Sequence, residues 1–229
     1  QLTPAEQALV MGRLVTKLGI RHLHAIVGCS YGGMVAQALA SQLCQQQFDF
    51  SLGRLVVVCA AHEPHANATA YRCLQRQILA LGEKHGLASE CLVLARSLGM
   101  VLYRSPQEFA NRFPANPHWQ QGEAKFEIES YLQAQGQKFV QRFSSKAYLC
   151  LSRSIDLHQC DPSTITLPTV LIASLTDQVA PIEQAREFAD LLPDSTLCEV
   201  DSIYGHDAFL LEVKQIGTIL HNALEGVAA

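Results

Sequence analysis

The chain has 229 residues, of which 48% are hydrophobic and 17% charged, a composition that suits one or two compact units with a sizeable core. Its formal net charge of −4 excludes the basic face expected of a protein that binds nucleic acid or anionic lipid. No apolar run approaches the ~20 residues that a membrane-spanning helix needs, and no signal peptide precedes the first predicted helix. We therefore expect neither a nucleic-acid partner nor a membrane association.

The eight cysteines occur singly, without any C-x-x-C spacing. Several of them fall inside apolar strand or helix patterns, so we interpret them as small buried side chains in a reducing, cytoplasmic compartment. Cys29, which adjoins the motif described below, is expected to point away from it. We predict no disulfide and no metal site.

A capping pattern opens the first predicted helix. Thr3 and Glu6 have the spacing of a capping box, and the helix is expected to end near Gly19. Residues 22–27 (HLHAIV) then predict a short buried strand, and residues 34–43 (MVAQALASQL) predict a helix rich in Ala and Leu.

The segment GCSYGG, residues 28–33, joins this strand to this helix. A G-x-S-x-G in that setting is the nucleophile elbow pattern of α/β-hydrolase enzymes, in which a tight turn strains the serine and leaves no space for neighbouring side chains. We predict that Ser30 is a nucleophile and that Gly28 and Gly32 supply the necessary room. The N–H of Tyr31 is predicted to form part of an oxyanion hole.

Residues 54–60 (RLVVVCA) predict another buried strand, after which no strand pattern occurs until Thr169. Helical patterns fill most of this interval, at residues 70–81, 89–103, 107–113, 126–143 and 145–157. The polar residues 114–125 predict a mobile loop.

An α/β pattern interrupted by helices is typical of a lid inserted over the carboxyl ends of the strands, where such sheets bind ligands. We predict an α/β core with the elbow at residues 1–61 and a helical lid at residues 62–166. Residues 167–229 are predicted to complete the core and to carry a catalytic Asp and His.

A serine hydroxyl is a weak nucleophile until a base takes its proton, and in α/β hydrolases the acid and the His follow the serine in that order. Residues 169–174 (TVLIAS) predict a strand that ends just before Asp177. Residues 196–201 (TLCEVD) predict a second strand, and His206 lies on the loop that follows it. Residues 181–192 predict the helix that connects the two strands. Asp177 also has a plainer interpretation, as a carboxylate at a helix N-terminus.

Only four strand candidates are visible, whereas an α/β-hydrolase sheet normally has several strands before the nucleophile. We therefore predict an α/β-hydrolase fold with a mostly parallel sheet that lacks its N-terminal strands here. The early loop that donates a second N–H to the oxyanion hole is missing as well. We expect a preceding segment or a second chain to supply both.

Two charged residues could hold a free amino acid, whose ammonium needs an anion and whose carboxylate needs a fork-shaped cation. Asp207 directly follows the predicted catalytic His, and Arg96 lies in an otherwise apolar helical pattern. Alternatively, Asp207 is a carboxylate at a helix start and Arg96 is a surface arginine.

Further segments resemble one known family. They are the elbow with Gly33 and Met34, residues 95–100 (ARSLGM) with 103–105 (YRS), residues 126–132 (FEIESYL) with 136–139 (GQKF), then Phe143, residues 148–149 (YL) and residues 204–210 (YGHDAFL). Through these motifs nearly the whole chain resembles the carboxyl-terminal two-thirds of the homoserine O-acyltransferases. These are α/β-hydrolase-fold enzymes of methionine biosynthesis, most of which use acetyl-CoA. The chain departs from the family pattern after Arg76, where an Asp-Pro-rich loop is absent.

The resemblance implies Ser30 as nucleophile, Asp177 as the orienting acid and His206 as the base. It also implies that Arg96 and Asp207 bind the amino-acid acceptor. The expected reaction is ping-pong transfer of an acyl group to L-homoserine, with acetyl-CoA as the first expectation for the co-substrate and succinyl-CoA as the second. No bound cofactor is needed, and the resemblance favours a homodimer.

Three alternatives stay open. One is an acyltransferase of the same kind that acts on serine, because one methylene contributes only ~1–3 kcal/mol of discrimination. Another is a plain esterase, and the third is a non-catalytic, truncated homologue. The sequence offers no physical basis for choosing an acetyl over a succinyl donor.

Overall fold

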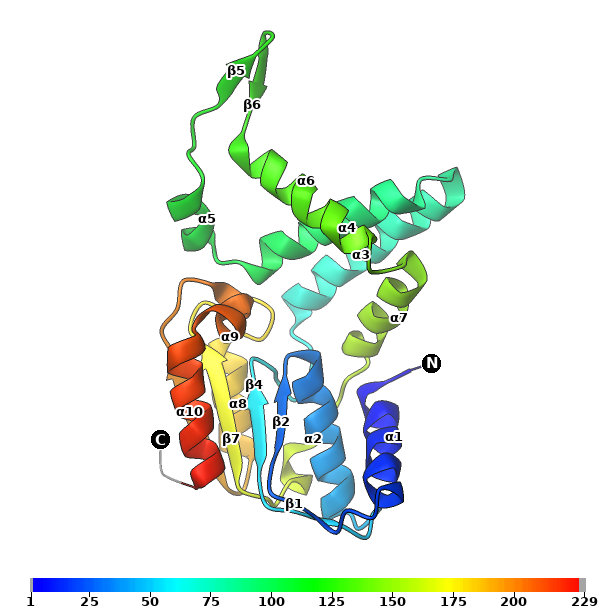
Figure 1. Cartoon of the computed structure of the whole chain (residues 1–229), viewed down its shortest axis with the longest axis vertical. Helices are drawn as coiled ribbons and strands as arrows, with labels where there is room; N and C mark the ends of the chain where they lie inside the picture. The colour runs from blue at the N-terminus through cyan, green and yellow to red at the C-terminus, as the bar shows by residue number, and fades with distance from the viewer. Residues whose placement is uncertain (1, 227–229) are drawn as a thin grey trace.

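The computed structural model describes residues 2–226. Its centre is a four-stranded, wholly parallel sheet in the order β2-β4-β7-β8, with helices on both faces (Figure 1). The strands are β2 (Ile26–Cys29), β4 (Leu55–Val58), β7 (Thr169–Ser174) and β8 (Ser195–Val200). All four end at the same edge of the sheet, which is where side chains from distant parts of the chain meet.

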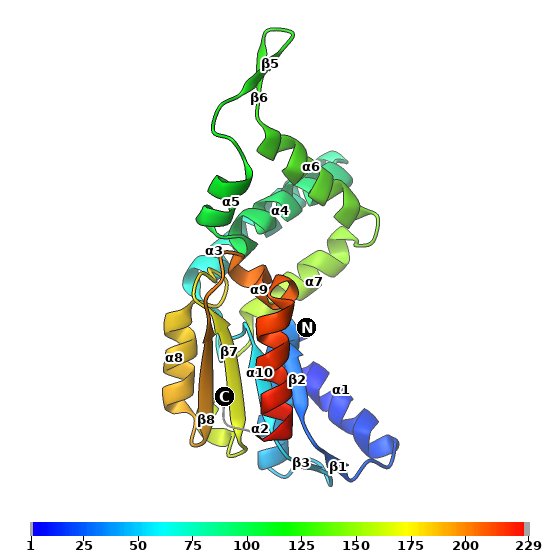
Figure 2. The same ribbon diagram turned by 60° about the vertical axis from the view of Figure 1, so that its left-hand side comes forward.

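Strand β4 shows why the sheet needs helices on both sides. All four of its residues are buried and apolar, as expected for a strand covered on both faces. Leu55 and Val57 pack in a cluster with α2 (Tyr31–Cys44) and α8 (Ile182–Leu191), while the alternate residues pack against α10 (Val213–Glu225). Figure 2 shows α8 and α10 flanking the sheet. Helix α1 (Pro4–Lys17) packs on α2 and begins at the predicted capping box of Thr3.

The strand predicted at residues 22–27 is divided in two. Strand β1 (His22–Leu23) pairs with β3 (Ser51–Leu52) in a separate small sheet, and β2 begins only at Ile26. Strand β3 is too short to give a sequence pattern, so it was absent from the prediction.

The helical middle of the chain lies beyond the carboxyl ends of the strands (Figure 1). It contains α3 (Ala66–His85), α4 (Ala88–Tyr103), α5 (Pro106–Arg112), α6 (Glu127–Val140) and α7 (Ser145–Asp156). Helices α3 and α4 pack on one another through the buried Leu79, Leu92 and Ala95.

The loop predicted at residues 114–125 is wrong in part. It contains an antiparallel hairpin of β5 (His118–Gln120) and β6 (Glu123–Lys125) that projects from the helices (Figures 1 and 2). Its strand residues are exposed or half-buried, and three residues a strand, with a single apolar residue in each, are too few to show an apolar alternation. The turn at Gln121 and Gly122, both with positive φ, is the one local signal of the hairpin.

Short helical turns complete the fold: η1 (Pro162–Thr164), η2 (Gly205–Asp207) and α9 (Ala208–Leu211). Cys160 and Ile165, near the end of the helical middle, already pack in the core cluster of β4. Within residues 2–226, no helix combines the length and the apolar character that crossing a membrane requires.

Candidate active site

Ser30 sits at the turn between β2 and α2 in a backbone conformation that side-chain-bearing residues rarely adopt, with φ of 49° and ψ of −121°. Its N–H donates to the carbonyl of Val58 at 2.8 Å, which ties the turn to the end of β4. Helix α2 begins at the next residue, so the Tyr31 N–H is one of the unpaired donors of a first helical turn.

Two glycines make room for this turn, and one of them differs from the prediction. A Cβ at Gly28 would lie 2.3 Å from the carbonyl oxygen of Gly32, and a Cβ at Gly33 would lie 2.8 Å from Ala60 Cβ. A Cβ at Gly32 would meet nothing within 4 Å, so the prediction that Gly32 provides the room is wrong. Gly33 fills that role because it faces β4, whereas Gly32 is exposed.

The three residues predicted to cooperate lie in one hydrogen-bonded series. Ser30 Oγ lies 2.7 Å from His206 Nε2, and His206 Nδ1 lies 2.7 Å from Asp177 Oδ2. The other carboxylate oxygen of Asp177 accepts hydrogen bonds from the backbone N–H groups of Val179 and Ala180, at 2.7 and 3.1 Å. The carboxylate therefore fixes the imidazole with Nδ1–H as donor, and Nε2 is left to accept the serine proton.

Two opposing effects set the proton affinity of His206. Burial lowers its pKa, but the Asp177 carboxylate, through its charge and its hydrogen bond, outweighs burial and holds the pKa above the ordinary value. Asp207 raises the pKa further, and the positive charge of Arg72 opposes it. The imidazole is thus a stronger base than an isolated histidine.

Gly205 positions the loop that carries His206. Its φ of 62° needs glycine, and a Cβ there would lie 2.6 Å from the carbonyl oxygen of Tyr103. Its N–H donates to Thr176 Oγ1 at 3.1 Å, and Ser105 Oγ donates to the carbonyl of Ile203 on the same loop. The loop is therefore held from both the loop after β7 and the α4–α5 connection.

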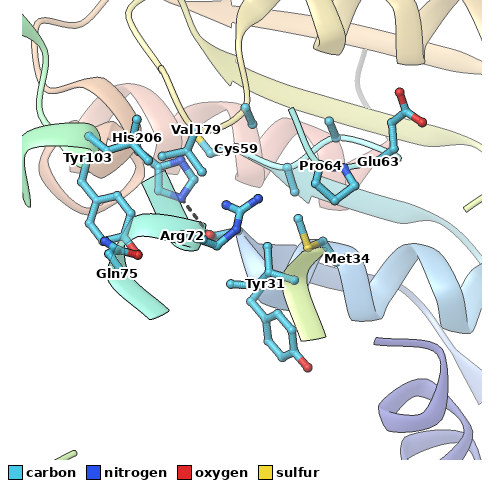
Figure 3. Close-up of a pocket in the computed structure, with 16 residues that line it drawn as sticks. Tyr31, Met34, Cys59, Glu63, Pro64, Arg72, Gln75, Tyr103, Val179 and His206 are labelled. Carbon is cyan, nitrogen blue, oxygen red and sulfur yellow. Dashed lines mark hydrogen bonds between the residues drawn. The ribbon is translucent and has the colours of Figure 1, made fainter. Parts of the chain in front are cut away.

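A pocket opens beside Ser30 and His206, and apolar side chains make up much of its wall (Figure 3). Ser30 and His206 line it together with Met34, Cys59, Ala60, Ala61, Glu63, Pro64, Arg72, Gln75, Leu102, Tyr103, Ile155, Val179 and Ala180, and with Tyr31. The Tyr31 ring points away from His206 (Figure 3), and its hydroxyl lies 2.7 Å from Ser154 Oγ. Only the backbone of Tyr31 can therefore serve an oxyanion at Ser30.

A second pocket adjoins the first, and Arg96 lines it. The two pockets share Arg72, Gln75, Tyr103 and Ile155 as a common wall, and Ser30 and His206 line only the first. The half-buried Arg96 guanidinium lies over the rings of Tyr103 and Phe139, 5.2 and 5.0 Å from their centres. Stacking on two rings is not the environment of a surface arginine.

Asp207 lies next to His206 in η2 but lines neither pocket. Its Oδ2 forms an ion pair with Arg104 Nε at 2.9 Å. Of the two residues predicted to hold one amino acid, Arg96 lines the second pocket and Asp207 has a cationic partner in Arg104.

Arg72 and Gln75 also line the first pocket, and the sequence prediction missed both. They lie on one face of α3, one turn apart, and both are buried. Two buried polar residues in a polar helix pattern give no sequence signal, since a surface face has the same composition.

The cysteines and the metal-binding residue types form no site of their own. The cysteines in the described part of the chain are all free thiols. Cys29 packs against the cluster of β4 and α10, and burial raises its pKa. Residues 2–226 bring together no group of three His, Cys, Asp or Glu side chains that could hold a metal ion.

Comparison with known proteins identifies the fold. The family described as alpha/beta hydrolase fold matches residues 5–213. The chain belongs to the α/β-hydrolase fold family. The predicted fold class is therefore confirmed, and the elbow serine of this α/β hydrolase lies where the family pattern has its nucleophile.

Named relatives of this α/β hydrolase agree with the resemblance that the motifs indicate. It is 40% identical to homoserine O-succinyltransferase of Xanthomonas campestris over 96% of the chain, and 30% identical to homoserine O-acetyltransferase of Chlorobium chlorochromatii over 97%. The crystal structure of homoserine O-acetyltransferase from Staphylococcus aureus superposes with a TM-score of 0.79 at 25% identity, covering 98% of the chain. The chain spans 58%, 66% and 65% of these three proteins, respectively.

Proposed function

We propose that this protein transfers an acyl group from an acyl-CoA thioester to the hydroxyl of L-homoserine, a step of methionine biosynthesis, through an acyl ester of Ser30. The observation that carries the proposal is the series Ser30–His206–Asp177 at the mouth of the first pocket. The relatives named as homoserine O-succinyltransferase and homoserine O-acetyltransferase support the acceptor and the reaction type.

In the first half-reaction Ser30 Oγ attacks the thioester carbonyl carbon as its proton passes to His206 Nε2. The tetrahedral intermediate carries a negative oxygen, which the Tyr31 N–H stabilises; losing one such donor typically raises the barrier by ~3 kcal/mol. The intermediate collapses as the carbon–sulfur bond breaks, and His206 returns the proton to the sulfur of coenzyme A. An acyl-Ser30 ester remains.

In the second half-reaction the homoserine hydroxyl attacks this ester while His206 takes the hydroxyl proton. The bond between the acyl carbon and Ser30 Oγ then breaks, and the proton returns to Ser30. Water competes as a nucleophile, so the acceptor must be held close to the ester while water is kept out. We assign Arg96 and Asp207 to the acceptor. Arg96 binds the carboxylate of homoserine, and Asp207 binds the homoserine ammonium, which replaces Arg104 as the ion-pair partner of Asp207.

The experiment measures two products at once, thiol release from acetyl-CoA or succinyl-CoA and O-acylhomoserine by mass spectrometry. It uses the full-length natural protein, including any residues that flank this chain. The proposal requires thiol release to rise with homoserine and the acylated amino acid to account for it.

Other outcomes identify the alternatives. Thiol release that homoserine does not accelerate, with free acid as the product, indicates an esterase. Acylated serine formed in preference to acylated homoserine indicates the related serine acyltransferase, and no thiol release from either donor indicates a binding protein. Each of these results contradicts the proposal.

A further inference from the structure

A cation of the protein already pairs with Asp207, which the proposed function assigns to the ammonium of the acceptor. Arg104 Nε lies 2.9 Å from Asp207 Oδ2 and neutralises its charge. The two side chains are largely buried, with 14% and 16% of their surface exposed, so water and salt screen the pair only weakly. An ammonium can replace Arg104 only if the displaced guanidinium meets another anion, because an unpaired buried charge is unfavourable.

This ion pair lies next to the wall of the first pocket. Arg104 directly follows Tyr103 in the chain, and Asp207 directly follows His206. The rings of Tyr103 and His206 both line that pocket, and their centres are 5.6 Å apart. An acceptor that approaches His206 along the Tyr103 ring therefore comes close to the pair of Arg104 and Asp207.

Glu108 is a second carboxylate within reach of Arg104. It lies on α5 and is 5% exposed, and its Oε1 is 3.4 Å from Arg104 Nη1 and 3.4 Å from Arg112 Nη1. Two arginines thus share one oxygen at long distances. The other oxygen, Oε2, is buried and has no hydrogen-bond partner among residues 2–226. Because a buried acceptor without a partner is unfavourable, Glu108 has the capacity to bind a guanidinium more fully.

The two carboxylates are tied to one another more firmly than Arg104 is tied to either. The Glu108 N–H donates to Ser105 Oγ at 3.0 Å, and this hydroxyl donates to the carbonyl of Ile203 on the loop after β8. The start of α5 is therefore joined to the loop that carries Asp207. Within residues 2–226 the Arg104 Nε–H has no aligned hydrogen bond, despite its short distance to Asp207. This geometry leaves Arg104 as the group that can change partners.

We propose that Glu108 is a positioning residue that receives Arg104 when the acceptor binds. Arg104 turns from Asp207 to both oxygens of Glu108, and Asp207 is freed for the ammonium of the acceptor. This inference rests on the proposed function, because it names the event that opens Asp207 to homoserine. The exchange keeps every buried charge paired before and after binding. An acceptor that has no ammonium does not cause it.

The test separates the ammonium from the rest of the acceptor. Homoserine is compared with 4-hydroxybutyrate, which has the same hydroxyl and carboxylate but no ammonium, in assays of the full-length protein. Glu108→Gln keeps the shape of the side chain and removes its charge. We expect this variant to raise the KM for homoserine about 3- to 10-fold with a smaller change in kcat, the range given by one hydrogen bond. The inhibition constant of 4-hydroxybutyrate against homoserine should stay at the wild-type value.

Arg112→Met is the matched control, because Arg112 lines neither pocket and competes with Arg104 for Glu108 Oε1. Its side chain is 47% exposed, so the substitution should preserve the fold. Removal of the competitor should lower the KM for homoserine or leave it unchanged. If Glu108 only anchors α5, both substitutions should raise this KM and the inhibition constant of 4-hydroxybutyrate together. That outcome, or a wild-type KM in Glu108→Gln, overturns the inference and leaves the proposed function intact.

A binding arm separates the two hypotheses if the protein transfers no acyl group. Homoserine and 4-hydroxybutyrate are titrated by calorimetry into the Ser30→Ala protein with and without Glu108→Gln. Homoserine binding that weakens about 3- to 10-fold on loss of the Glu108 charge, with 4-hydroxybutyrate unaffected, supports the exchange even where the proposed function fails. Homoserine binding that is absent, or equal in the two proteins, overturns it.

Discussion

The edge of the sheet and the helices above it hold their functional residues in different ways. Ser30, Asp177 and His206 lie on short loops after parallel strands, and each loop is fixed by backbone hydrogen bonds or a positive φ. Arg72 and Arg96 lie on helices α3 and α4, where only side-chain contacts fix their direction. The comparison teaches that the positions of Ser30, Asp177 and His206 depend on backbone geometry, whereas those of the two arginines depend on how helices pack over the sheet edge.

The largest expected effect tests the sheet edge. Ser30→Ala should reduce acyl transfer by about 10⁶-fold, as for loss of other activated serine nucleophiles. Because the substitution leaves the backbone and its φ unchanged, the midpoint of chemical denaturation should stay at the wild-type value. Steady-state kinetics and a denaturation curve measure the two. Activity that survives the substitution would place the nucleophile elsewhere.

Asp177→Asn tests whether the carboxylate sets the tautomer and the basicity of His206. An amide cannot favour the Nδ1–H form in the same way, so the rate should fall by about 10⁴-fold. Neutral His206 is the active base, so activity rises with pH through its pKa. Since burial lowers that pKa and Asp177 raises it, the acidic limb of the rate–pH profile should move to lower pH in the variant. An unmoved limb contradicts the assignment.

Two glycines offer a matched test of the elbow. Gly28→Ala places a Cβ 2.3 Å from the Gly32 carbonyl and should reduce the free energy of unfolding by about 1–3 kcal/mol. Gly32→Ala should be neutral or stabilise by up to about 1 kcal/mol, because its Cβ meets open space in the first turn of α2. Urea denaturation of both variants distinguishes them, and equal destabilisation would refute this geometry.

The smallest effect concerns the acceptor. Asp207→Asn should raise the KM for homoserine about 10-fold with a smaller change in kcat, because one charge-assisted contact to the ammonium is lost. Glu199→Gln is the control, since Glu199 pairs with Arg186 on the exposed side of β8 and should leave KM unchanged. If both variants have the wild-type KM for homoserine, Asp207 forms its ion pair with Arg104 and does not bind the acceptor.

The sequence predicted the residues whose positions follow from local backbone rules. Ser30 lies in a strand–turn–helix motif, and His206 follows Gly205, whose positive φ requires glycine. The sequence did not reveal which side chain would face the pocket from a helix. Neither the second pocket that Arg96 lines nor the ion pair of Asp207 with Arg104 could be predicted from the sequence pattern.

The missed features do not have one physical origin. Arg72 is buried, and its partner Asp156 on α7 lies 84 positions along the chain. The strands of the β5–β6 hairpin have three residues each, and β3 has two, so neither gives an apolar period. Contacts between distant parts of the chain determine the burial of Arg72 and the pairing of β3, whereas the hairpin forms locally from strands too short to give a pattern.

The most direct measurement locates the acyl group on the protein. Full-length protein is mixed with succinyl-CoA, quenched and mapped by peptide mass spectrometry, then the experiment is repeated with a chase of L-homoserine. The account predicts an acyl ester on the peptide that contains Ser30, lost in the chase as O-acylhomoserine appears. Acyl transfer that proceeds with no ester on Ser30 would contradict it.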